Sequence, residues 1–401
     1  MHGSTLFFPA ASVYAVVALP LSMLSMLGFT VAFPGLATPA GHAHEMLFGF
    51  ALAVVAGHQL GPRTLPALAL LAATWLAGRV TSVFLPGNVA TAGVDIAFPA
   101  LLAWHLAPRL FRSAKKWRNQ ALPAVLTAIC ASAIALAVTA RLDAPLVPLT
   151  PRDMPRITVA LFSLLLLFMG GRLLAPVIAG QFYRQGANLA ARVQPRIEGA
   201  LIVLMTIAVV SLVLGGASNG HEPRTLQSAR LARSIAGAAL AAAGVLAGLR
   251  VVRWRLWALR GRPDLLCLAS GYGWLAVGLV AFGTAHALVP ADARAETLAL
   301  HLITIGSLGT LTLNVMALTW RLKSRDAAMP ARVLVAATLL LAAATLVRVL
   351  AGYDVADARP LLVVASACWA GAFALLLFLL VSTPGKRGGV RSRTRTPPRR
   401  A

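Results

Sequence analysis

Two histidines and a glutamate stand together where a long apolar segment of the sequence begins. His42, His44 and Glu45 lie in the run Gly41 to Phe50, which is otherwise apolar. Ionisable side chains are costly at the edge of hydrocarbon unless something binds them. A neutral imidazole is a common ligand of copper and of haem iron. The run therefore predicts a metal or cofactor site with His42 and His44 as candidate ligands.

The geometry of a helix limits what these two histidines can do together. His42 and Glu45 are three residues apart and share a face, whereas His44 is rotated by about 200° from His42. A regular helix cannot direct both imidazoles at one metal ion. They would share an ion only if His42 lies in the preceding loop; otherwise they serve different centres. We expect one ligand, one neighbour with a separate task, and Glu45 beside them as an orienting or neutralising group.

A third candidate ligand is His301, at the start of another apolar run. Gly306 and Gly309 follow it on the same segment. Small residues leave room for the close approach of another helix or of a flat ring. This arrangement suits an axial haem ligand. The alternative is a histidine that hydrogen-bonds a neighbouring helix.

Three further charged residues lie within apolar segments. Arg79 and Asp95 are opposite charges at similar predicted depth on consecutive spans, so we expect them to pair. The pair is either structural, or Arg79 also holds a haem propionate, because an arginine fork suits carboxylates. Arg172 either extends to the inner membrane interface or binds an anionic group of a cofactor or substrate. The remaining histidines, including His286, favour ordinary hydrogen bonding at helix ends or in loops.

The composition identifies the environment of these residues as a lipid bilayer. The chain of 401 residues is 59% hydrophobic and only 12% charged. Its apolar stretches approach the roughly 20 residues that a helix needs to cross the membrane. They lack the alternation of a transmembrane barrel. The sequence predicts an all-α polytopic protein with about twelve transmembrane helices, which begin near Pro9, Glu45, Thr64, Asn88, Ala121, Arg156, Arg196, Arg230, Asp264, Thr297, Ala331 and Pro360. The first is expected to run to Phe33 and the fourth to Ala107.

The net charge of +24 is a topology signal in such a chain, and we expect no nucleic-acid partner. Basic residues gather after the even-numbered spans, which places both termini in the cytoplasm. Residues 1–382 form the predicted helical bundle, and residues 383–401 form a basic, disordered tail held near anionic lipid. The three cysteines are isolated, which excludes a disulfide framework and a covalent c-type haem site.

Several of these runs together resemble the NnrS family of bacterial membrane proteins. The resemblance rests on His42 to Phe50, Trp75 to Arg79, Gly170 to Arg172 and His301 to Leu313, with aromatic residues at Tyr272 and Trp274. It implies a polytopic protein of the bacterial inner membrane that contains haem, here of the b type, and copper. It also implies a role in nitric oxide metabolism and in resistance to nitrosative stress in denitrifying and related bacteria. Two departures are a short link after residue 55 and the lack of a Gly-His pair after Trp320.

Two other functions are compatible with the same residues. A secondary transporter would use His42, Glu45, Asp95 and Arg79 to bind protons or a substrate, and its twelve spans with broken helices fit that class. The two halves of the sequence show no convincing repeat, which weighs against it. A relative of the haem-copper oxidases would carry an adjacent histidine pair, which is absent. No proton or electron route is visible in the sequence, so whether the protein is an enzyme stays open.

Overall fold

The computed structural model describes residues 1–139, 149–150, 153–192, 194–217, 223–289, 292–323, 330–353 and 357–382. The basic tail that was predicted for residues 383–401 lies outside these ranges, as does His221. Within them every regular element is a helix and there is no β-strand, in agreement with the predicted fold class.

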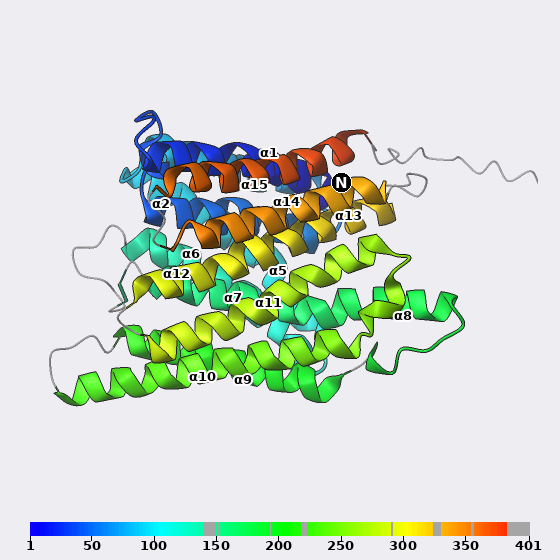
Figure 1. Ribbon diagram of the computed structural model, residues 1–401. Helices are drawn as coiled ribbons and strands as arrows, with labels where there is room; N and C mark the ends of the chain where they lie inside the picture. The colour runs from blue at the N-terminus through cyan, green and yellow to red at the C-terminus, as the bar shows by residue number, and fades with distance from the viewer. Residues whose placement is uncertain are drawn as a thin grey trace, which may run out of the picture.

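Helices cross the molecule from end to end and lie roughly side by side (Figure 1). The helices of the first half are α1 (Gly3–Met26), α2 (Pro39–His44), α3 (Leu52–Gln59), α4 (Leu65–Phe84), α5 (Val89–Ser113), α6 (Trp117–Thr139), α7 (Asp153–Met169) and α8 (Ala175–Arg184). Those of the second half are α9 (Pro195–Ala217), α10 (Pro223–Arg253), α11 (Pro263–Leu288), α12 (Ala293–His301), α13 (Thr310–Lys323), α14 (Ala331–Leu350) and α15 (Arg359–Ser382). Short 3₁₀ turns are η1 (Pro34–Leu36), η4 (Ala190–Arg192) and η5 (Leu256–Leu259).

Three further segments are π-helices, in which the backbone hydrogen bonds run from residue i to i+5. They are η2 (Glu45–Ala51), η3 (Gly170–Leu174) and η6 (Leu302–Gly309). η3 joins α7 to α8 without a break, and η6 joins α12 to α13. Each π segment falls within a run that the sequence singled out, and π segments are frequent at functional sites.

Eleven helical segments in the described ranges are long and apolar enough to cross a membrane. The predicted span at Glu45 is the one not among them; it consists of α2, η2 and α3 and carries the polar residues His42, His44 and Glu45. These three are continuous from Pro39 to Gln59, and together they account for the twelfth predicted span. Two predicted ends were wrong. The first helix stops at Met26 rather than Phe33, just before Gly28 adopts a φ of +79°. The fourth predicted span, α5, continues to Ser113 instead of ending at Ala107.

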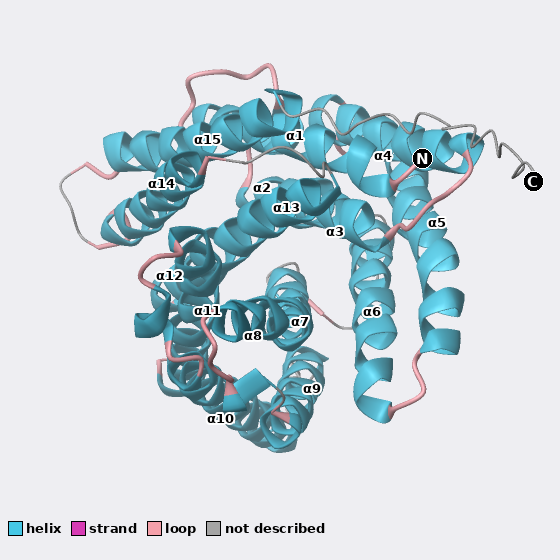
Figure 2. Ribbon diagram, turned by 90° about the vertical axis from the view of Figure 1, so that its right-hand side faces the viewer, coloured by secondary structure: helices cyan, strands magenta, loops and turns pink. Residues whose placement is uncertain are grey.

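Viewed along the bundle, α7 and α8 lie in the middle, with α3, α6, α9, α10, α11 and α13 around them (Figure 2). Nearly every residue of α7 from Ile157 to Phe168 is buried, as its central place requires. The helix pair α10 and α11 packs closely because Gly237 and Gly283 face each other's backbone: a Cβ on Gly283 would lie 2.5 Å from the backbone nitrogen of Ala241. Small residues permit this approach in membranes.

A π-helix leaves a backbone carbonyl without its usual donor, and buried carbonyls need one. Side chains supply it beside each of the three segments. The Trp75 indole donates to the Gly49 carbonyl at 2.9 Å, and the Thr312 hydroxyl donates to the Leu308 carbonyl at 2.7 Å. The Leu167 carbonyl, just before η3, accepts from the Arg250 guanidinium at 3.3 Å. The aromatic and polar residues of these runs therefore have a structural task.

The room that Gly306 and Gly309 leave is occupied by rings of the protein itself. A Cβ on Gly306 would lie 3.0 Å from the Trp274 ring, and one on Gly309 would lie 2.7 Å from the Trp369 ring. Trp369 is fixed there by donating its indole N–H to the carbonyl of Ala15 on α1, at 3.2 Å. The sequence predicted space at these two glycines for a flat ring or another helix, and two tryptophan side chains fill that space.

Candidate metal centre

Glu45 is the centre of a buried ion-pair network at the end of the bundle where α2 lies (Figure 1). Its side chain is 1% exposed. Oε1 accepts a hydrogen bond from His44 Nδ1 at 2.9 Å, and Oε2 accepts one from Arg79 Nη1 at 2.6 Å and another from the Tyr14 hydroxyl. A carboxylate buried to this degree persists only when it is paired and hydrogen-bonded, and three donors provide this.

The network continues through Arg79 to Asp95. Arg79 Nη2 lies 2.9 Å from Asp95 Oδ1, so the predicted ion pair is present. The Ser82 hydroxyl donates to Asp95 Oδ2 at 2.8 Å, and His44 Nε2 lies 3.7 Å from the same oxygen. Two carboxylates thus face one guanidinium. A cavity of about 200 Å³ adjoins His44, Glu45, Ser82 and Asp95.

Glycines allow this network to form. A Cβ on Gly49 would lie 2.8 Å from Tyr14 Cε1 and 3.0 Å from Glu45 Oε2, so only glycine fits between them. A Cβ on Gly35 would lie 2.8 Å from the backbone carbon of Ser82, which brings the turn before α2 directly onto α4. This close approach fixes where α2 presents its histidines.

His42 belongs to a second group of side chains. Its Nδ1 lies 3.1 Å from the Ser22 hydroxyl, which itself lies 3.1 Å from the Leu36 carbonyl. The carbonyl can only accept, so the single hydroxyl proton of Ser22 goes to Leu36. His42 Nδ1 must then donate to Ser22, and the lone pair of a neutral His42 is on Nε2.

His301 has the same arrangement. Its Nδ1 donates to the Thr297 carbonyl at 2.7 Å, which again leaves the lone pair on Nε2. His42 and His301 interact electrostatically with each other, and each interacts with Arg348 on α14. His42 on α2, His301 on α12 and Arg348 on α14 are therefore near enough to interact electrostatically, and α12 and α14 pack against each other.

This pair has the chemistry of a ligand set. Histidines that bind a metal commonly hold their orientation by donating the other ring proton to a second group, as His42 and His301 do. Two neutral imidazoles suit haem iron or copper. Across the described ranges, no group of three or more His, Cys, Asp or Glu side chains is placed to hold a metal ion, so a closed four-ligand protein site is not formed there.

The structure thus separates the predicted site residues into three places. His42 and His301 interact electrostatically, while His44 joins Glu45, Arg79 and Asp95. His42 and His44 are thus separated, as expected. Glu45, however, was expected on the face of His42, and it hydrogen-bonds His44 instead because it turns toward Arg79 and Tyr14 at the start of η2. Arg172 lies elsewhere. It donates to the Asn119 side chain, approaches Glu198 at 3.5 Å and is 42% exposed.

A second ion-pair cluster repeats the pattern of the first on other helices. His286 Nδ1 lies 2.7 Å from Glu296 Oε1, and the other carboxylate oxygen accepts from Arg156. Arg156 also lies 3.2 Å from Asp153. The order of contacts, His to Glu to Arg to Asp, is that of the His44 network. His286, for which the sequence favoured ordinary hydrogen bonding, is indeed a hydrogen-bonded histidine, held by a buried carboxylate.

Sequence reasoning missed two residues of the site and left one undecided. Tyr14 and Ser22 were not identified, although they are polar residues eight positions apart, about two helical turns, within an apolar segment. That spacing was the available signal. The sequence leaves the role of Arg348, a charge within the span that begins at Ala331, undecided, because nothing in it links that span to His42.

The fold and this site define a polytopic, all-helical membrane protein with an ordered imidazole pair next to a buried ion-pair network. A family model described as NnrS protein matches residues 2–383. The chain therefore belongs to the NnrS family. A search of curated proteins finds no match.

Proposed function

We propose that the protein binds haem at His42 and His301 and acts in nitric oxide metabolism or in resistance to nitrosative stress. The observation that carries the proposal is that both histidines have the same tautomer, with the proton on Nδ1. Each commits Nδ1 to a protein acceptor and keeps Nε2 for a ligand. Family membership, across residues 2–383, supports the same assignment.

The residues around the pair would tune the bound group. Haem iron, when held there, would supply the redox and nitric oxide chemistry. Arg348 brings a positive charge near both imidazoles, so it would favour an anionic ligand or a haem carboxylate. Arg79 is less suited to a propionate than expected, because Glu45 and Asp95 already occupy both of its terminal nitrogens.

Copper, which the family resemblance also implies, would be taken by His44. Its Nδ1 is fixed by Glu45, while Nε2 lies toward Asp95 and the adjoining cavity of about 200 Å³. An imidazole and a carboxylate oxygen are both ligands that copper accepts. This proposal gives the two histidines of the His42–His44 run the separate tasks that helical geometry requires.

The proposed location is the bacterial inner membrane, with both termini in the cytoplasm. The start of α1 and the end of α15 lie at the same end of the bundle, opposite α2 (Figure 1). The positive-inside rule then places the histidine pair toward the outer face. Alkaline phosphatase and green fluorescent protein fused after Ser382 would test this: only the second fusion should be active.

The visible spectrum of the purified protein tests the haem assignment. We expect a Soret band that responds to nitric oxide and is lost or shifted in His301→Ala and in His42→Ala. His105→Ala is the matched control, because His105 Nδ1 makes the same bond to a carbonyl four residues earlier, at 2.8 Å on α5. Its spectrum should equal that of the wild type.

The possible results separate the proposed function from its rival. A folded, colourless and metal-free protein would refute haem binding and favour a transporter that uses the Glu45 network. A Soret band that is the same in wild type, His301→Ala and His42→Ala would refute the ligand assignment alone. Copper content in His44→Ala, measured by mass spectrometry, tests the second metal in the same preparations.

A further inference from the structure

A small cavity lies where the three π segments come together. Its volume is about 70 Å³. The segments η2, η3 and η6 each contribute to its wall, together with the central helix α7 and with α3. One wall residue from each of these elements, in the same order, is Ala51, Gly170, Leu308, Phe162 and Val54.

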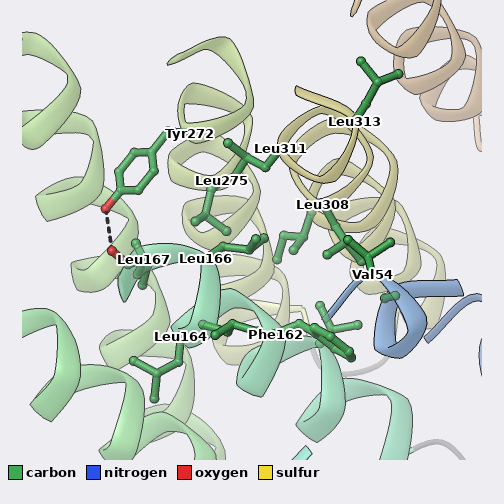
Figure 3. Packing of buried hydrophobic residues seen from close by; sticks show 14 of the residues in the cluster. Val54, Phe162, Leu164, Leu166, Leu167, Tyr272, Leu275, Leu308, Leu311 and Leu313 are labelled. Atoms are coloured by element: carbon green, nitrogen blue, oxygen red, sulfur yellow. Dashed lines mark hydrogen bonds between the residues drawn. The ribbon is translucent and has the colours of Figure 1, made fainter. Parts of the chain in front are cut away.

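Most of the wall of this cavity is apolar, and His58, Gln59 and Thr312 are its polar residues. Phe162 and Leu166 on α7 extend toward Leu308, and Val54 closes the side formed by α3 (Figure 3). The Thr312 side chain also lies at the cavity, but its hydroxyl donates to the carbonyls of Leu308 and Gly309 at 2.7 and 3.0 Å. The hydroxyl proton of Thr312 is therefore already hydrogen-bonded within its own helix.

The cavity is partly open rather than enclosed, but space of this kind inside a helical bundle still calls for an explanation. Protein interiors contain few voids larger than a water molecule, since each void forfeits contact energy. Here three π segments meet, and each contributes a residue of irregular backbone to the wall. The same irregularities that distinguish these runs therefore leave the space.

The size and the wall decide what can occupy it. A bound water needs two to four polar partners, whereas apolar surface stays dry and takes up xenon or small apolar molecules. The part of the wall formed by Phe162, Leu166 and Leu308 is apolar. A volume of about 70 Å³ is too small for a porphyrin or a lipid chain. We propose that the cavity is a binding site for one small, uncharged gas molecule of diatomic size.

The cavity is connected to the histidine pair through shared helices. Leu308 follows His301 by seven residues, about 10 Å along a helix. Gas held there would be near the pair without crossing a polar region. That the gas is nitric oxide, held in reserve for the metal, rests on the proposed function; the apolar gas site itself does not.

Xenon is the probe, because it reports an apolar cavity without any haem. Crystals of the whole protein would be pressurised with xenon and its anomalous density measured. We expect one peak bounded by Phe162, Leu166 and Leu308. It should vanish in Leu166→Trp, whose larger side chain fills the space, and persist in Leu164→Trp. Leu164 lies on the same helix, is equally apolar, and points away from the cavity (Figure 3).

Absence of xenon from this position in the wild type overturns the proposal, as does a peak that survives in Leu166→Trp. The pair Leu166→Phe and Leu164→Phe gives the same comparison if a tryptophan variant does not fold. Xenon at the site in a protein that binds no haem would uphold the gas site and refute the proposed function. In the haem-loaded protein, the rate at which nitric oxide rebinds after photolysis should change in Leu166→Trp and not in Leu164→Trp.

Discussion

Replacing Arg79 by methionine should destabilise the protein far more than the same change at another arginine of the bundle. Arg79 is 5% exposed and makes charge-assisted hydrogen bonds of 2.6 Å to Glu45 and 2.9 Å to Asp95. Its loss would leave two carboxylates buried without a cation. Removing one partner of a buried ion pair costs roughly 3–5 kcal/mol.

Arg172→Met is the matched control. Arg172 also lies in a helical span and contacts a glutamate, but at 3.5 Å and with 42% of its side chain exposed. An exposed pair contributes about 0–1 kcal/mol. We therefore expect the free energy of unfolding to fall by about 3–5 kcal/mol in Arg79→Met and to fall by at most about 1 kcal/mol in Arg172→Met.

The assay is reversible unfolding in mixed micelles with increasing dodecyl sulfate, followed by tryptophan fluorescence. A double variant, Arg79→Met with Glu45→Gln, gives an internal check. It removes one of the two uncompensated charges, so it should be more stable than Arg79→Met alone. Equal losses in Arg79→Met and Arg172→Met, or no recovery in the double variant, would show that the network contributes little and that the reasoning from burial is wrong.

Three further substitutions test other parts of the structure. Gly49→Ala should lower the thermal midpoint of unfolding, because its Cβ would meet a tyrosine ring at 2.8 Å, whereas Gly273→Ala, with no atom within 4 Å of the added Cβ, should not. Trp75→Phe removes the indole donor to the π-helical carbonyl and should cost about 1–3 kcal/mol in micelle unfolding; an unchanged midpoint would refute that role. Glu296→Gln should weaken the pairing of Arg156, which keeps its contact with Asp153, and so destabilise the second cluster; faster amide exchange at the start of α12 would report this.

The sequence was a good guide to the fold because the membrane makes the strongest demands on it. Apolar length and loop charge sufficed for eleven spans, and the errors were in ends such as Phe33, where a single glycine turn decides. The span at Glu45 differs for another reason. Its division into α2, η2 and α3 depends on tertiary partners such as Trp75, which no local pattern reveals.

The site was harder to predict, for a physical reason that the residues illustrate. Helical rotation within one segment correctly separated His42 from His44, since that is local geometry. Local geometry does not determine which distant helix each histidine faces. Ser22 on α1 and Arg348 on α14 are near His42 only because of how the helices pack. Arg79 and Asp95 were paired correctly because consecutive spans are usual neighbours and opposite charges in hydrocarbon must find each other.

The π segments join the fold to the family's sequence pattern. An extra residue per bulge is costly unless the displaced carbonyl finds a donor, and each of the three segments has one, from Trp75, Thr312 or Arg250. Glycines must also stand where the bulged backbone meets another side chain, as Gly49 does at Tyr14. In these segments the backbone irregularity occurs together with a side-chain donor and, at Gly49, with a glycine that leaves room for a neighbouring ring. Such irregularity is costly in lipid and persists where it shapes a site. In this chain η6 begins directly after His301, η2 begins directly after His44, and all three π segments line the apolar cavity.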